Sequence, residues 1–293
     1  MERHRLILWA IPVLGLIALV GCTASSDTSD VLFPPSNGSD TPTLTPIQSD
    51  GLATIKGTVT FDGDPPAMPI VTGVDVHKDK AYCCSEMTGC PHEQTWVVDA
   101  ATKGVANVVV WVDCPRGKYF PMEAFFKQNA KKIWREKVII DQPYCMFDPH
   151  VDFIFPQYFD GQNMQATGQS FVIRNSAKIP HNINMASRNS ILQPGSETPF
   201  DLKAKADMTS FPMGCDIHGW MKSYVLSFDH PYVAKTNEKG QFEISNVPAG
   251  ADLTLKAWQE DLRQKIPAVN GAAGKPIKLK AGQTEEFNFQ VNK

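Results

Sequence analysis

The sequence lacks several features that would point to common classes of protein. It has no run of basic residues, and 28 Lys and Arg against 31 Asp and Glu give a formal net charge of −3. Nucleic acid is therefore not expected as a partner, because binding to phosphates requires concentrated positive charge. A C-x-x-C-H haem motif, a phosphate-binding loop and a convincing Ser/His/Asp set are also absent. We expect a protein that is not an enzyme.

No apolar run is long enough for a comfortable transmembrane helix, which needs about 20 residues. The one candidate, Leu6 to Val20, follows Arg3 and Arg5 and is typical of a signal-peptide core. It ends at Leu19-Val20-Gly21-Cys22, which resembles the lipobox of bacterial lipoproteins. The resemblance implies a signal peptide over residues 1–21 and a lipidated Cys22, which would anchor an exported protein to a bacterial membrane, facing the periplasm or the cell surface. The alternative is an uncleaved anchor helix with an incidental cysteine.

Residues 22–51 have almost no aromatic side chains and are rich in Ser, Thr, Asp and Pro. A segment of this composition buries too little apolar surface to fold. We predict a disordered tether between the lipid and the folded part of the chain.

Cysteine is scarce, with seven in the chain. Besides Cys22 and Cys215, the candidates for disulfides are Cys83, Cys84, Cys90, Cys114 and Cys145. In an oxidising compartment this odd set allows two disulfides and one free thiol, but spacing does not reveal the connectivity. Cys84, Cys90 and His92 are alternatively soft-metal ligands, although their spacing matches no common zinc pattern.

Short β-prone runs with Gly and Pro between them dominate the rest of the chain, which predicts an all-β fold of β-sandwiches. The expected strands are Ile55–Phe61, Val105–Val112, Val138–Ile140, Val151–Phe155, Gln169–Asn175, Leu202–Phe211, Tyr224–Phe228, Gln241–Ile244, Leu253–Trp258 and Glu286–Val291. Turns are expected at 236–240 and 246–250, and the stretch from 67 to 100 is expected to be irregular. The one plausible helix runs from Met122 to Arg135.

The most specific chemical signal comes from one histidine and a later cluster of three residues. His181 stands in Pro180-His181-Asn182, and Cys215, His218 and Met221 follow at intervals of three. A copper ion that cycles between Cu(I) and Cu(II) is commonly held by one thiolate, two imidazoles and a weak axial thioether. Cys215 would bind as a thiolate, His181 and His218 as neutral imidazoles, and Met221 as the axial ligand that helps to set the reduction potential.

Other metal centres fit these residues less well. A binuclear copper site needs a second cysteine where the chain has Phe211, and a multicopper oxidase usually has histidines where the chain has Gly214 and Asp216. A structural zinc site is conceivable, but methionine is an unlikely zinc ligand. The remaining candidates near these positions are expected to pack or to form ordinary hydrogen bonds: Met185, Met213, His92 and His150. Trp220, close to His218, is expected either to shield the site or form part of a docking surface, or to pack in the core.

Residues of about 137–229 resemble a cupredoxin, and among cupredoxins amicyanin is the nearest. The resemblance rests on Pro180-His181-Asn182 and on the short C-x2-H-x2-M loop from Cys215 to Met221. It implies a Greek-key β-sandwich with one type-1 copper bound by His181, Cys215, His218 and Met221. The chain departs from amicyanin in an insert from Phe155 to Thr167 and in Gly219 after the second histidine. These departures affect the expected partner surface and remove no ligand.

A second resemblance is to transthyretin-like, carboxypeptidase-regulatory-type sandwich modules. Its signature is Thr236-x3-Gly240-x-Phe242-x-Ile244-x2-Val247-Pro248-x-Gly250, and residues 57–63 resemble the opening strand of the same module. We therefore divide the folded chain into an N-terminal β segment (52–136), a cupredoxin-like copper domain (137–229) and a regulatory-like β segment (230–293). One hypothesis is that residues 52–115 and 230–293 form one small sandwich, split by the copper domain.

Together these features predict a membrane-tethered, extracytoplasmic type-1 copper protein that carries single electrons between a donor and an acceptor, both unidentified. One alternative is a cell-surface binding or adhesion protein with a relic copper site. Another is a copper chaperone or storage protein.

Overall fold

The structure is a computed structural model that describes residues 44–86, 89–122, 125, 135–204 and 208–293. The expected signal peptide, Cys22, most of the tether and most of the expected helix from Met122 to Arg135 lie outside these residues. The tether ends earlier than expected. Thr45–Pro46 (β1) pairs with Lys118–Tyr119 (β4), and Ile47 is buried in a core, so these residues belong to the folded part.

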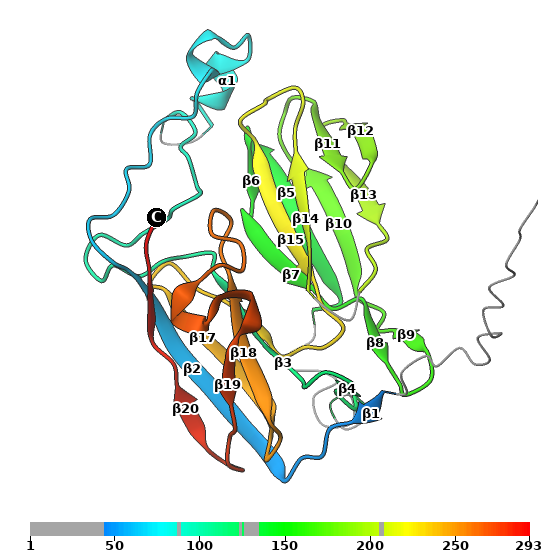
Figure 1. Ribbon diagram of the computed structural model, residues 1–293. Coiled ribbons are helices and arrows are strands. Elements are labelled where there is room, and N and C mark those ends of the chain that lie inside the picture. Colours follow the sequence, from blue (N-terminus) through cyan, green and yellow to red (C-terminus); the bar gives the residue numbers. More distant parts are fainter. Residues whose placement is uncertain (1–43, 87–88, 123–124, 126–134, 205–207) are drawn as a thin grey trace, which may run out of the picture. The chain divides into compact units, whose positions relative to one another are not determined.

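The prediction of an all-β fold is confirmed, and the strands form two sandwiches (Figure 1). What we call the central sandwich has one sheet in the order β13-β10-β5-β6 and a second in the order β12-β11-β14-β15-β7. The strands of the first sheet are β5 (Lys137–Tyr144), β6 (Met146–Asp148), β10 (Ser170–Asn175) and β13 (Ser196–Phe200). Those of the second are β7 (Val151–Ile154), β11 (His181–Met185), β12 (Arg188–Leu192), β14 (Thr209–Gly214) and β15 (Lys222–Ser227).

The core of the central sandwich is built from side chains that alternate along these strands. On β5, Val138 and Ile140 are buried, and on β11, Ile183 and Met185 are buried. This is the pattern of strands that cover a core with one face. The core reaches as far as Cys215, so the candidate metal centre lies at the border of tightly packed apolar side chains.

The flanking sandwich is formed by segments from the two sides of the central one. Its first sheet has the order β16-β3-β18-β19, and its second has β17-β2-β20, with β21 also paired to β2. The strands are β2 (Gly51–Phe61), β3 (Val109–Asp113), β16 (Val233–Lys235), β17 (Gln241–Ala249), β18 (Leu253–Trp258), β19 (Lys275–Ile277), β20 (Thr284–Glu286) and β21 (Phe289–Val291). The blue N-terminal and the orange C-terminal strands lie side by side in Figure 1. This is the strand pairing that the hypothesis of a split sandwich requires.

Strand β3 explains why the run from Val105 to Val112 is apolar without interruption. Val110 and Val112 pack in the core of the flanking sandwich, whereas Val109 and Trp111 pack against Tyr224 and other residues of the central one. A strand that is buried on both faces needs apolar residues at every position. The strand begins later than predicted, at Val109, because Asn107 adopts a left-handed conformation with φ of 63°.

Several other elements differ from their predictions. β17 continues to Ala249, across most of the turn expected at 246–250, because a bulge at Asn246, with φ of 59°, absorbs the irregularity within the strand. The insert from Phe155 to Thr167 forms a hairpin of β8 (Gln157–Phe159) and β9 (Met164–Ala166). The strands β11, β12 and β13 were not predicted, because polar residues dominate them.

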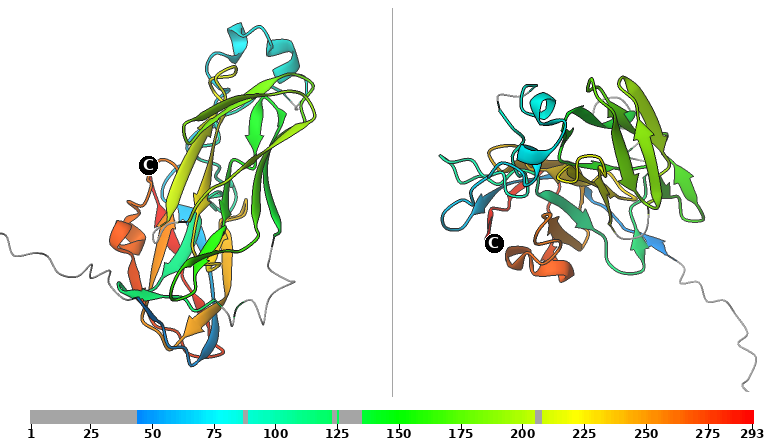
Figure 2. Two further views of the ribbon diagram at one scale, coloured as in Figure 1. Left: turned by 90° about the vertical axis from the view of Figure 1, so that its right-hand side faces the viewer. Right: turned by 90° about the horizontal axis from the view of Figure 1, so that it is seen from above.

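Helices are short in the part of the chain that the structure describes. They are η1 (Val74–Val76), α1 (Lys80–Cys83), η2 (Pro267–Val269) and η3 (Gly271–Ala273). None of the described helices has the length and apolar character needed to cross a membrane. The segment with η1 and α1 lies at the end of the central sandwich where β14 meets β15 (Figures 1 and 2).

Candidate metal centre

Three of the four predicted ligands place their donor atoms close together. Nδ1 of His181 lies 3.0 Å from Nδ1 of His218, and Sγ of Cys215 lies 4.0 Å from the same nitrogen. A single ion fits between atoms at these separations, since metal–nitrogen distances are about 2.0 Å and metal–sulfur distances about 2.3 Å. Both imidazoles are fully buried, and Cys215 is only 3% exposed.

The fold brings these side chains together through strand pairing. His181 is the first residue of β11, and Cys215 directly follows β14. The two strands are antiparallel partners, with Met185 opposite Met213. Predicted ligands that are far apart in the sequence therefore meet at one end of one sheet.

Met221, the fourth predicted ligand, ends the same short loop. Its amide donates a hydrogen bond to the carbonyl of His218 at 2.9 Å, and its carbonyl accepts one from the amide of Cys215 at 3.3 Å. The side chain of Met221 is 2% exposed and packs in the same core as Cys215. The loop is thus closed at both ends, with three predicted ligands inside it.

Asn182 joins the two ligand segments. Its backbone amide donates to Sγ of Cys215, and its side-chain oxygen accepts from the amides of Asp216 and Ile217. Amides that point at the sulfur and along the loop hold Cys215 in place whether or not an ion is bound.

Burial shifts the pKa values of the predicted ligand side chains. It lowers the pKa of His181 to about 4, with a further contribution from the neighbouring His218. It also lowers the pKa of His218, helped by His77, although Asp79 acts in the opposite direction. The pKa of the Cys215 thiol is raised by burial. Both imidazoles are therefore neutral at pH 7, as metal ligands must be, and the thiol must lose its proton to bind an ion.

Four of the five remaining cysteines form disulfides, which pair Cys83 with Cys145 and Cys84 with Cys90. Cys114 carries a free thiol in the described part of the chain, so the five candidates divide into two disulfides and one unpaired cysteine. The alternative of a soft-metal site at Cys84, Cys90 and His92 is also wrong, because the two sulfurs are bonded to each other. His92 instead contacts the carbonyl of Met68 through Nδ1 at 2.6 Å.

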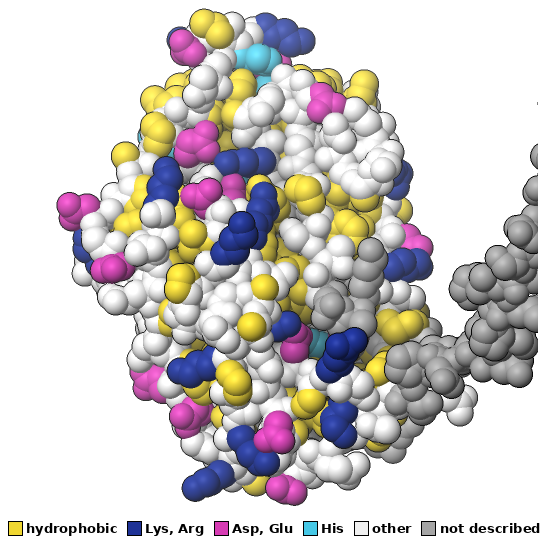
Figure 3. Space-filling view, viewed as in Figure 1, with side chains coloured by type: hydrophobic (Ala, Val, Ile, Leu, Met, Phe, Trp, Pro, Cys, Tyr) yellow, Lys and Arg dark blue, Asp and Glu magenta, His cyan; other side chains and the backbone are white. Residues whose placement is uncertain are grey.

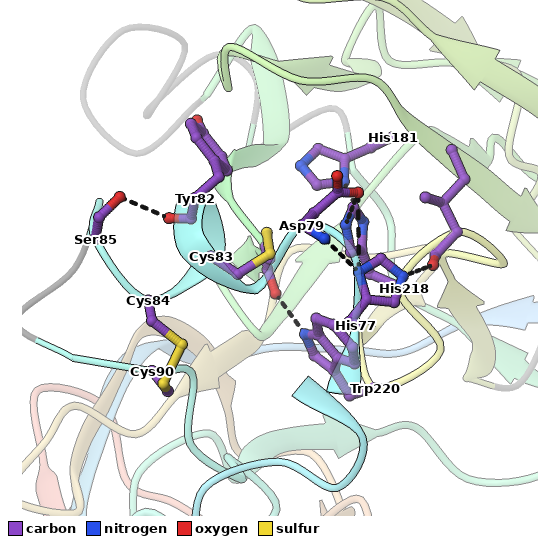
Figure 4. The surroundings of a disulfide bond; sticks show 12 residues. His77, Asp79, Tyr82, Cys83, Cys84, Ser85, Cys90, His181, His218 and Trp220 are labelled. Carbon is purple, nitrogen blue, oxygen red and sulfur yellow. Dashed lines mark hydrogen bonds and ion pairs between the residues drawn. A yellow bond between two sulfur atoms is a disulfide. The ribbon is translucent and has the colours of Figure 1, made fainter. Parts of the chain in front are cut away.

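Two residues near the centre were not anticipated from the sequence. Nε2 of His218 lies 3.1 Å from Oδ2 of Asp79, and the ring of His77 packs against that of His218 at 4.7 Å between centroids (Figure 4). Both come from the stretch that was expected to be irregular. In the sequence, His77 and Asp79 are marked only by their position shortly before the adjacent cysteines Cys83 and Cys84. The spacing of these residues does not connect them to the predicted ligands.

The other side chains considered near the ligands have structural surroundings. Met185 and Met213 are buried in the core, which confirms their prediction as packing residues. His150 is buried and pairs with Glu260, so it is hydrogen-bonded as expected. Trp220 donates from Nε1 to the carbonyl of Cys145 at 2.9 Å and lies edge-on to His77.

No family model matches the chain, and no curated protein matches it either. Among solved structures, a novel purple cupredoxin from Nitrosopumilus maritimus is similar, with 16% identity and a TM-score of 0.24 over 31% of this chain and 97% of that one.

Proposed function

We propose that the chain is a type-1 copper protein that carries single electrons. The observation that supports this most directly is the convergence of Nδ1 of His181, Nδ1 of His218 and Sγ of Cys215 on one point. One thiolate and two imidazoles, with a thioether on the same loop, are the donor set of blue-copper centres. When bound there, copper supplies a reversible one-electron couple.

The surrounding residues favour electron transfer because they hold the ligands in one arrangement. The loop from Cys215 to Met221 is closed by its own backbone hydrogen bonds, and Asn182 ties it to the strand of His181. A centre whose ligands move little between oxidation states exchanges electrons at a low reorganisation cost. Each of the four ligand side chains is at most 3% exposed, which favours a fixed centre over a chaperone that must hand its ion to an acceptor.

The setting that we propose is outside the cytoplasm, with Cys22 as a lipid anchor on a bacterial membrane. Two disulfides in the described residues support an oxidising compartment. On the face in Figure 3, basic and acidic side chains are interspersed. This face offers no concentrated positive charge to a nucleic acid.

Cyclic voltammetry of the copper-loaded protein tests this function. We expect a reversible one-electron wave that is absent from the metal-free protein. An adhesion protein with a relic site would give no wave. A chaperone would lose its copper to a Cu(I)-specific chelator within the time of the scan, whereas a buried electron-transfer centre would retain it.

A further inference from the structure

The imidazole of His218 has the candidate metal position at one edge and a carboxylate at the opposite edge. Nδ1 points to His181 and Cys215, while Nε2 lies 3.1 Å from Oδ2 of Asp79. Asp79 comes from the segment before α1, far from the predicted ligands in sequence, and Figure 4 shows its carboxylate beside the ring of His218. The imidazole is therefore held between a carboxylate and the other ligands.

This contact determines which nitrogen of His218 carries the hydrogen. A carboxylate only accepts hydrogen bonds, so the hydrogen must be on Nε2. The lone pair of the neutral ring is then on Nδ1, the atom that faces Cys215 and His181. Metal-binding histidines commonly have such an outer partner, which fixes the ring and makes it a stronger donor.

A disulfide and two hydrogen bonds link Asp79 back to the loop of His218 and hold it in this position. The carbonyl of Asp79 accepts from the amide of Cys83 at 2.9 Å, and Cys83 is joined to Cys145 by a disulfide. The carbonyl of Cys145 in turn accepts from Nε1 of Trp220 at 2.9 Å, and Trp220 lies two residues after His218. The two ends of the Asp79–His218 hydrogen bond are thus fixed relative to each other by one covalent and two hydrogen-bonded links.

His77 completes the cover over the ligand loop. Its Nε2 donates to the carbonyl of Ile217 at 3.0 Å, which leaves Nδ1 as the acceptor for the amide of Asp79 at 3.2 Å. Its ring also contacts those of His218 and Trp220, at 4.7 and 5.2 Å between centroids. The segment is therefore docked on the loop through several independent contacts.

The other imidazole has no comparable support. Nε2 of His181 is buried and has no hydrogen-bond partner among the described residues. The outer carboxylate thus forms a hydrogen bond with only one of the two histidines, although its charge also reaches His181.

We propose that Asp79 is a positioning residue of the metal centre, held over His218 by the disulfide between Cys83 and Cys145. It orients the imidazole and fixes its Nε2–H tautomer so that Nδ1 is ready to bind. That the bound ion is copper rests on the proposed function. The tautomer of His218 follows from its contact with Asp79 and does not depend on which ion binds. The Cys83–Cys145 disulfide thereby has a role at the centre although neither sulfur is a ligand.

Two measurements on the full chain test this role separately. In the metal-free protein, nitrogen NMR of 15N-labelled histidine reports the tautomer of His218. We expect the Nε2–H form in the unaltered protein and its loss in Asp79→Ala. In the second measurement, Cu(II) affinity is determined by competition with a chelator, and Asp79→Ala should lower it about 10- to 100-fold. Asp79→Asn keeps an acceptor oxygen of the same size and should give an intermediate loss.

Asp75→Ala is the matched control, since it removes an exposed carboxylate from the same segment. It should leave both the tautomer and the affinity unchanged. An equal loss of affinity in the Asp75 and Asp79 variants would overturn the proposal, and so would an unchanged tautomer in Asp79→Ala. If the unaltered protein binds no copper, the proposed function fails. The NMR measurement of the His218 tautomer in the metal-free protein still tests the role of Asp79.

Discussion

The backbone amide of Asn182 donates a hydrogen bond to Sγ of Cys215 at 3.4 Å. The residue that follows one predicted ligand thus contacts the donor atom of another, although 33 positions separate them. The Asn182 side chain adds two bonds to the amides of Asp216 and Ile217. One asparagine therefore fixes the distance between the two ligand segments, which explains why it stands directly after the first histidine.

Replacing Asn182 should loosen the ligand loop. In Asn182→Ala two loop amides lose their acceptor, and we expect the metal-free protein to lose roughly 2 kcal/mol of stability, the usual range for buried polar groups left unpaired. Denaturant unfolding measures this change. Asn184→Ala removes an exposed partner of Asp216 and should cost clearly less. Equal losses in the two variants would show that the buried bonds have no special role.

Met221 should tune the reduction potential. Met221→Gln is expected to keep copper and to lower the potential, because an amide oxygen favours Cu(II) more than a thioether does. Voltammetry of the two copper-loaded proteins checks this. Met213→Leu, a change at a packing methionine of the same core, should leave the potential where it is. An unaltered potential in Met221→Gln would place Met221 outside the ligand set.

Copper uptake at pH 7 should release one proton. Burial raises the pKa of the Cys215 thiol, so the metal-free protein holds this proton and must give it up when the thiolate binds. His181, with a pKa lowered to about 4, is already neutral and releases none. Calorimetry in buffers of different ionisation enthalpy counts the protons. Uptake without proton release would mean that Cys215 is already ionised or does not bind.

A buried carboxylate next to the flanking sandwich should make stability depend on pH. Burial alone would raise the pKa of Glu260, but hydrogen bonds and charges from His150 and Lys222 outweigh it and lower the pKa to about 2. The stabilisation is thus complete above the unfolded-state pKa of about 4.5 and is lost as the pH falls toward 2. We expect up to about 3 kcal/mol of acid-dependent stability from this group.

Glu260→Gln should therefore flatten the curve of unfolding free energy against pH in this acid range and lower stability at pH 7. Glu243→Gln is the control, because that carboxylate forms an exposed pair with Lys56 and such pairs contribute little. The same acid slope in Glu260→Gln as in the unaltered protein would contradict the role given to Glu260.

Patterns within short stretches of the sequence predicted those elements whose structure depends on residues close together in the chain. The alternation from Ile55 to Phe61 predicted a strand, and β2 contains this stretch. The spacing of Cys215, His218 and Met221 places them in one loop, which the structure forms between β14 and β15. These features depend on residues a few positions apart, so their pattern is visible in the chain itself.

Features that depend on distant contacts were missed. The hydrogen bond between Asp79 and His218 joins residues 139 positions apart, and only the folded chain brings them together. The strands β12 and β13 lack apolar alternation because they have exposed positions at the edge of their sheets, where solvent replaces one neighbour. The disulfide pairing was likewise open, since five cysteines allow many connectivities.

The most direct test of the proposed centre is the visible and electron-paramagnetic-resonance spectrum of the protein loaded with Cu(II), recorded beside the Cys215→Ser variant. The ligand set of His181, Cys215, His218 and Met221 predicts an intense blue or green band and a narrow copper hyperfine splitting. Both should disappear in Cys215→Ser, because the band arises from the thiolate. A colourless protein without bound copper, or the same colour in the variant, would contradict the assignment.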